Sequence, residues 1–129
     1  MILLISILSA LIAGNTVVLK PSEESSLVVM KIVQIFAAAN LPAGVLNLVT
    51  GHGDVGQALV AHPLTKAVSF TGSTATGKKI AAQAGGLLKR CVLELGGKDA
   101  LIILPDIDLD FAVNATTFSG LFHQGQTCM

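Results

Sequence analysis

The sequence predicts an α/β protein with a doubly wound, mostly parallel sheet, and three observations support this prediction. Short apolar or β-branched runs alternate with longer segments of helical spacing along the 129 residues. Gly, Pro and Asn residues separate these runs, as is usual at turns. The composition is strongly apolar, with 52% hydrophobic residues, which is enough to form a hydrophobic core. Repeated strand–helix–strand units favour parallel strands with helices on both faces of the sheet.

Residues 1–13 are apolar throughout, and we expect a buried helix that stops at Gly14 and Asn15. This segment is shorter than the about 20 residues that a membrane-spanning helix needs. Neither Lys nor Arg precedes it, which argues against a secretory signal peptide. We therefore expect no membrane association and a cytoplasmic protein.

Five strands and four further helices are expected after this segment, in alternation. The strands are expected at residues 16–19, 45–49, 67–70, 91–94 and 100–104. The helices are expected at residues 21–39, 54–62, 75–84 and from 109 onward. Asp54 and Asp108 are expected to cap two of these helices, and Gly96 with Gly97 marks the one candidate domain boundary.

Charge and composition argue against several classes of protein. Eight Lys and Arg balance eight Asp and Glu, and Arg90 is the single arginine, so a nucleic-acid partner is not expected. Charged residues make up only 12% of the chain, about half the usual ~25%. Such a chain lacks the polar surface to cover itself, and we expect it to be a fragment that packs against more protein.

Polar residues gather where the expected strands end. These positions are Lys20, the loop 50–53, the loop 71–73 and Glu94. Ligands of open parallel sheets bind at the carboxyl ends of the strands. The strand ends together therefore indicate a ligand site more strongly than any single motif does.

Each candidate residue also has an ordinary structural explanation. Ser73 and Thr74 begin a helix and could hold a phosphate, although a simple helix cap explains them as well. Lys20 and Glu23 suit a nucleotide ribose, but they could be a solvated lysine and a glutamate that opens a helix. Glu94 is either placed as a general base or is a strand-end carboxylate paired with a lysine.

The cysteines and the possible metal ligands give weaker signals. Cys91 falls inside an expected strand and is interpreted as a core residue, whereas Cys128 follows a polar turn that contains glycine. A disulfide between them is open but is not expected in an intracellular chain. The three histidines are isolated, and Asp106, Asp108 and Asp110 lack the Gly and distal Glu of a calcium loop. We expect no metal site.

Four motifs stand in order along the chain. They are GNTVVLKPSE at 14–23, FTGST at 70–74, ELGGK at 94–98 and GQTC at 125–128. With these motifs the sequence, from Ala13 onward, closely resembles the aldehyde dehydrogenase superfamily. The resemblance implies that residues 1–96 are part of a Rossmann-like NAD(P)-binding domain. It implies that residues 97–129 begin a second, α/β catalytic domain.

The resemblance also implies roles for individual residues. Lys20 and Glu23 match the pair that binds the adenosine ribose hydroxyls, Cys128 matches the nucleophile, and Glu94 matches the general base. The other cofactor-binding residues that it implies are Thr71, Gly72, Ser73, Gly77 and Leu95, with Ser73 beside the pyrophosphate. In this chemistry the thiolate attacks an aldehyde carbon, hydride passes to the nicotinamide, and water activated by Glu94 releases a carboxylic acid.

The function implied for the parent enzyme is oxidation of a small aldehyde with NAD, NADP being the alternative cofactor. The parent is expected to be a homo-oligomer, a dimer or a tetramer. The fragment alone is expected to be inactive, because the family's oxyanion-stabilising Asn and much of its catalytic domain are absent. Two alternatives are a CoA-acylating semialdehyde dehydrogenase, against which Glu94 argues, and a nucleotide-binding fragment without catalysis.

Overall fold

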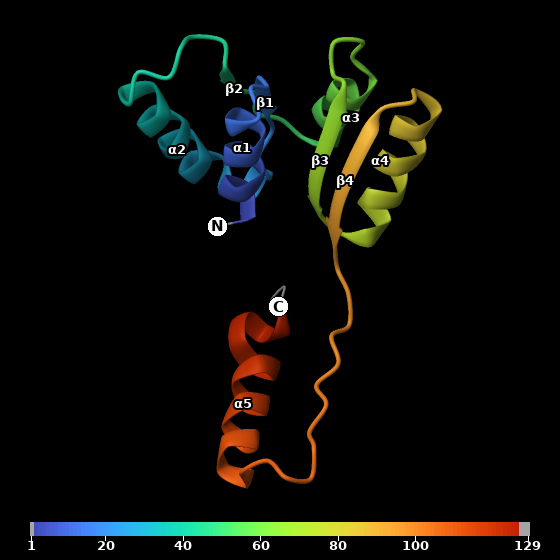
Figure 1. The fold of residues 1–129 in the computed structure, drawn as a ribbon. Helices are drawn as coiled ribbons and strands as arrows, with labels where there is room; N and C mark the ends of the chain where they lie inside the picture. Colours follow the sequence, from blue (N-terminus) through green and yellow to red (C-terminus); the bar gives the residue numbers. More distant parts are fainter. Residues whose placement is uncertain (1, 127–129) are drawn as a thin grey trace. The chain divides into compact units, whose positions relative to one another are not determined.

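The structure is a computed structural model that describes residues 2–126 (Figure 1). The chain divides into two compact units, residues 1–96 and residues 97–129. The first unit contains every strand in the described part of the chain, and the second contains a single α-helix.

The first unit alternates helices and strands. Its helices are α1 (Ile2–Ile12), η1 (Glu23–Ser25, a short 3-10 helix), α2 (Ser26–Ala38), α3 (Gly53–Ala61) and α4 (Thr74–Gly86). Its strands are β1 (Val17–Leu19), β2 (Leu46–Leu48), β3 (Ala67–Gly72) and β4 (Arg90–Leu95). The α/β class that the alternating pattern predicted is confirmed.

The strands pair in parallel, two by two (Figure 1). Val17 of β1 lies opposite Leu46 of β2, and α2 makes the crossover between them. Thr71 of β3 lies opposite Glu94 of β4, and α4 makes the second crossover. The predicted parallel sheet is present in the described residues as two separate two-stranded pairs, and no described strand hydrogen-bonds to members of both pairs.

The apolar first segment forms α1, and it ends as the sequence predicted. Gly14 adopts the left-handed conformation with φ +78°. Its N–H donates to the Leu11 carbonyl at 2.9 Å, and the Asn15 N–H donates to the Ala10 carbonyl at 3.0 Å. These two bonds close the last turn of the helix at a position that favours glycine. Within the described residues, no helix is both long enough and apolar enough to span a membrane.

The first unit has few fully buried side chains. Each of its four α-helices contributes one buried apolar residue, namely Ile7, Val29, Val60 and Ala84. Many other large apolar side chains are exposed, among them Ile12, Leu27 and Leu64. The low share of charged residues in the sequence is thus matched by apolar surface on the folded unit.

The second unit consists of an irregular stretch followed by α5 (Leu109–Leu121) and the short η2 (Phe122–Gly125). The Asp108 carboxylate accepts a hydrogen bond from the Phe111 N–H at 2.8 Å, so the predicted cap of this helix is confirmed. The strand expected at 100–104 is not formed. An isolated extended segment cannot satisfy its backbone groups, and no described strand pairs with this one.

Candidate functional site

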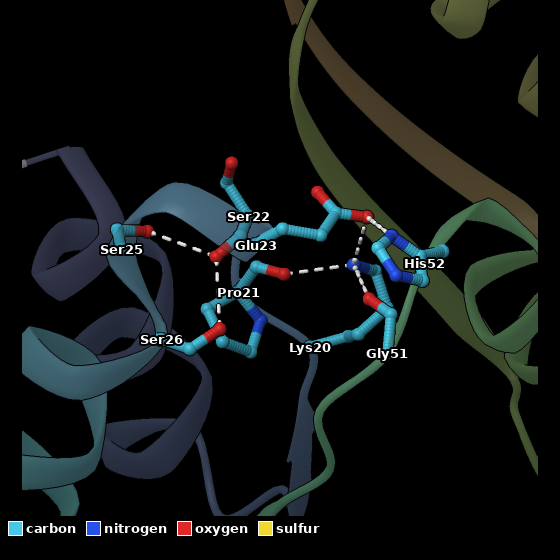
Figure 2. A network of polar contacts seen from close by, with 8 residues as sticks. All are labelled: Lys20, Pro21, Ser22, Glu23, Ser25, Ser26, Gly51 and His52. Atoms are coloured by element: carbon cyan, nitrogen blue, oxygen red, sulfur yellow. Dashed lines mark hydrogen bonds and ion pairs between the residues drawn. The ribbon is translucent and has the colours of Figure 1, made fainter.

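The turn that follows β1 bends the chain so that Glu23 approaches Lys20 (Figure 2). The hydroxyl groups of Ser25 and Ser26 both donate to the Ser22 carbonyl oxygen, at 3.3 and 3.1 Å. These bonds close the turn locally as the chain enters η1 and α2. As a result, the first acidic side chain after the strand lies beside the lysine that ends it.

Lys20 connects the carboxyl ends of the two paired strands. Its Nζ donates to the carbonyl oxygens of Pro21 at 2.7 Å and Gly51 at 2.8 Å, and Gly51 lies in the loop after β2. The side chain is only 18% exposed, and its aliphatic stem passes beside Gly56 of α3. Lys20 is therefore held in place on three sides rather than free in solvent.

Glu23 receives two positively polarised groups on one carboxylate oxygen. Its Oε1 lies 3.8 Å from Lys20 Nζ and 3.3 Å from His52 Nδ1. Hydrogen bonding to its own backbone N–H, and then the charges of Lys20 and His52, hold the pKa of the Glu23 carboxyl below its usual value. The other carboxylate oxygen points away from both partners (Figure 2). Glu23 is thus an anionic acceptor, and its second oxygen contacts neither Lys20 nor His52.

His52 is the residue of this cluster for which the sequence pattern predicted no role of its own. It precedes α3 as its N-cap residue, and its side chain is 85% exposed. Asp54, which was expected to cap this helix, lies inside its first turn instead, because the helix begins at Gly53. The loop 50–53 was predicted to lie at the end of a strand. Parallel pairing of β1 with β2 brings this loop next to Lys20.

A second group of predicted site residues lies where β3 leads into α4. Ser73 is the N-cap of α4, and its Oγ accepts from the Thr76 N–H at 3.2 Å, as the helix-cap interpretation predicted. The Thr74 hydroxyl donates to the Gly96 carbonyl at 3.4 Å. The N–H groups of Thr74 and Ala75 have no intrahelical acceptor at this helix start. They remain able to donate to an anion.

Gly77 and Leu95 meet in the packing of α4 against β4. Gly77 is buried, and a Cβ atom at this position would lie 2.5 Å from Leu95 Cδ2. A side chain at Gly77 would have to displace Leu95, so the glycine permits the close approach of helix and strand. Gly72 lies opposite Leu95 in the parallel pair, which places these predicted residues at one end of β3 and β4.

Of the two predicted catalytic residues, the structure describes Glu94. Glu94 is near the end of β4 and is exposed, and no ion pair of its carboxylate is found in the described part of the chain. A lysine partner for Glu94 is therefore not seen there. Cys128 lies outside the described residues. Cys91 lies in β4 opposite Val68 and is half-buried, so it is not among the fully buried residues that its interpretation as a core residue had placed it with.

The structure thus gathers the predicted residues into two groups. Lys20 and Glu23 form one group with the loop after β2. The residues at the ends of β3 and β4 and the start of α4 form the other. Between residues 2 and 126, no hydrogen bond or ion pair joins the two groups, and no set of three or more His, Cys, Asp or Glu could hold a metal ion.

Comparison with known proteins identifies the family of this chain. The model of the aldehyde dehydrogenase family matches residues 1–129. The chain belongs to the aldehyde dehydrogenase family. Over 119 residues, this aldehyde dehydrogenase chain is 48% identical to betaine aldehyde dehydrogenase of Vibrio vulnificus, a match that covers 92% of the chain and 24% of the relative.

Solved structures of aldehyde dehydrogenases share its fold. The enzyme from Bartonella henselae superposes with a TM-score of 0.88 at 47% identity, covering 95% of this chain and 26% of that one. Aldehyde dehydrogenase C from Pseudomonas syringae, solved in complex with NAD+ and octanal, gives 0.85 at 45% identity, covering 89% and 24%. This aldehyde dehydrogenase chain therefore spans about a quarter of the length of the relatives it matches.

Proposed function

We propose that this chain carries the adenosine-binding residues and the reacting residues of an NAD-dependent aldehyde dehydrogenase that oxidises a small aldehyde to a carboxylic acid. The observation that supports the proposal most directly is the Lys20–Glu23 pair, a fixed cation beside an anionic acceptor at the joined ends of β1 and β2. Strand ends of this kind are where parallel sheets bind nucleotides.

The chemistry of both residue groups fits a dinucleotide. The Glu23 carboxylate can accept a hydrogen bond from a ribose hydroxyl, with Lys20 held beside it. The first N–H groups of α4, which have no acceptor within the helix, suit a pyrophosphate. The Ser73 hydroxyl, which donates to Thr76 Oγ1 at 3.0 Å in this structure, can turn to the same ligand. We assign Thr71, Gly72, Gly77 and Leu95 to the same site, where they shape the end of the β3–β4 pair.

The charge of Glu23 favours NAD over NADP in this proposal. A 2′-phosphate on the adenosine ribose would meet the carboxylate as a like charge. A relative from Pseudomonas syringae was solved with NAD+. Another solved relative, from E. coli and 41% identical, is an NADP dependent enzyme. Family membership alone therefore does not decide between NAD and NADP, and in this proposal the charges beside the ribose do.

The reacting residues divide the proposed oxidation into two steps. The Cys128 thiolate attacks the aldehyde carbon and forms a thiohemiacetal, whose carbon then loses hydride and becomes a thioester. NAD+, when bound, accepts that hydride. Glu94 takes a proton from water, the water oxygen attacks the thioester carbon, and the carbon–sulfur bond breaks to release the acid and the thiolate. The exposure of Glu94 is compatible with access of that water.

We further propose how the chain fits into the whole enzyme. Residues 1–96 form part of the NAD(P)-binding domain, and residues 97–129 form the start of the catalytic domain. The enzyme is a cytoplasmic homo-oligomer, a dimer or a tetramer, and the 129-residue stretch has no dehydrogenase activity by itself. These assignments rest on family membership and on the position of the two groups of residues.

The test of this proposal is pre-steady-state formation of NADH by the full-length gene product. In the Glu94→Gln variant, a burst of NADH is expected to persist while steady turnover falls by ~10²-fold or more, because hydride transfer precedes the step that needs the base. The Asp99→Asn variant is a matched control, since Asp99 is also exposed and lies five residues further along the chain. Equal loss of burst and turnover contradicts the role of Glu94, and turnover that requires coenzyme A identifies the acylating alternative.

A further inference from the structure

His52 sits against the carboxylate that is proposed to meet the adenosine ribose. Its Nδ1 lies 3.3 Å from Glu23 Oε1, within hydrogen-bonding distance, and the carboxylate can only accept, so the imidazole is the donor. The residue before it, Gly51, is fixed by the bond from Lys20 Nζ to its carbonyl oxygen. The loop backbone therefore places the imidazole beside the Glu23 carboxylate, although the His52 side chain is 85% exposed.

Within residues 2–126, the charged groups that face His52 or flank it in sequence come from three elements. Glu23 faces it from η1, Lys20 faces the same carboxylate oxygen from the end of β1, and Asp54 lies in the first turn of α3. When the imidazole is neutral, the charges of Lys20 and Glu23 cancel. When it is protonated, two cations flank the one carboxylate of Glu23.

We propose that His52 is a specificity-determining residue of this dinucleotide site, and that its protonation admits a 2′-phosphate on the adenosine ribose. This inference rests on the proposed function. A neutral imidazole holds the Glu23 carboxylate in place, where it accepts from ribose hydroxyls and repels a phosphate. A protonated imidazole balances the carboxylate and leaves the Lys20 charge available to the phosphate, so the preference for the unphosphorylated ribose weakens.

Histidine is suited to this role because its charge ordinarily changes between about pH 5 and pH 8. Two unit charges about 4 Å apart in water interact by about 1 kcal/mol, which corresponds to about a fivefold change in affinity. We therefore expect a modest, graded change in selectivity rather than an exchange of one cofactor for the other.

The test compares two probes that carry only the adenosine end, ADP and 2′,5′-ADP. Their dissociation constants for the full-length gene product are measured by calorimetry at about pH 6 and about pH 8, on either side of the usual histidine range. The affinity of 2′,5′-ADP relative to ADP is expected to rise by about fivefold on acidification. Part of any such rise comes from the 2′-phosphate itself, because the second pKa of a phosphate monoester is about 6.

Variants at His52 separate these two contributions. His52→Gln keeps a hydrogen-bond donor but no titrating charge, so only the contribution of the phosphate is expected to remain. His52→Lys carries a permanent charge, and its relative affinity for 2′,5′-ADP at about pH 8 is expected to approach that of the wild type at about pH 6. His62→Gln removes another exposed histidine, at the far end of α3, and is expected to behave as wild type.

Two outcomes overturn the inference in different ways. If wild type and His52→Gln show the same pH dependence of relative affinity, His52 does not set the selectivity, while binding of ADP still supports the proposed function. If neither probe binds at either pH, the proposed dinucleotide site fails, and the role of His52 fails with it.

Discussion

At the scale of single residues, the candidate site depends on local turns that place charged side chains with little freedom. Lys20 uses two of its three N–H groups on backbone carbonyls, and Glu23 uses one oxygen on Lys20 and His52. A lysine held in this way keeps its position whether or not a ligand is bound. The cluster is therefore organised in advance, which reduces the entropy lost when a ligand binds.

Leu88 is a residue whose backbone conformation does not suit its side chain. It ends the turn after α4 with φ +53°, in the left-handed region, and its side chain is 95% exposed. The Lys89 N–H donates to the Ala84 carbonyl at 2.9 Å across this turn, a pattern in which glycine is usual. Leu88→Gly is expected to stabilise the protein by about 1 kcal/mol, because a left-handed conformation costs a non-glycine residue about 1–2 kcal/mol.

The thermal unfolding midpoint measures this gain. Leu87→Gly is the matched control, because Leu87 precedes the turn with φ −103° and needs no glycine. That control is expected to lower the midpoint, since glycine adds entropy to the unfolded chain. A lower midpoint for Leu88→Gly as well would contradict the strain at Leu88.

At the scale of elements, Lys89 joins helix α3 to the start of β4. Its Nζ donates to the Val60 carbonyl and, at 2.7 Å, to the His62 carbonyl, at the carboxyl end of α3. A cation at that end also interacts favourably with the helix dipole. Lys89→Met is expected to destabilise the protein by about 1.5–3 kcal/mol, the usual range for a hydrogen bond to a charged group.

Hydrogen exchange at the end of α3 is the sharpest measurement of this link. Lys89→Met is expected to speed exchange of the His62 amide, which donates to Ala58 at 2.9 Å in the last turn. Lys78→Met is the control, because Lys78 is exposed on α4 and makes no ion pair in the part of the chain that is described. Unchanged exchange in Lys89→Met would show that α3 does not depend on Lys89.

Features set by neighbours in the sequence were predictable, and features set by distant partners were not. The stop of α1 at Gly14 and the cap of α5 at Asp108 follow from residues within one turn, and both were anticipated. The approach of Lys20 to Glu23 is also local, since three residues separate them. The contact of His52 with Glu23 spans two strand ends, and it emerges only when β1 and β2 are paired.

Segment 100–104 shows the opposite case. Its residues favour a strand locally, but no described strand pairs with it. Its apolar residues are typical of a strand, yet the structure leaves them without regular pairing. Strand propensity describes the fit of a residue to a paired sheet, so it cannot form a strand where no partner lies alongside. The roles of Glu94 and Cys128 stay predictions, because they depend on groups brought together from across the whole enzyme.

At the scale of the whole molecule, many large apolar side chains of the described residues are exposed. Ile102 is 81% exposed, and its neighbours Leu101, Ile103 and Leu104 are also exposed. Contiguous exposed apolar residues usually mark a surface that packs against other protein. No described strand pairs with this segment, and an apolar segment without strand pairing is, in addition, a template for pairing with another chain.

Residues 1–129, prepared as a separate chain, are therefore expected to self-associate through segment 101–104. Ile102→Lys is expected to reduce this association, because a charge on an exposed strand opposes edge-to-edge pairing. Sedimentation velocity over a range of concentrations measures it as the rise of the average mass with concentration. Leu64→Lys is the matched control: Leu64 is 78% exposed but lies in the turn between α3 and β3, away from that segment in sequence. Equal loss of association in both variants would mean that general hydrophobicity, and not this segment, drives it.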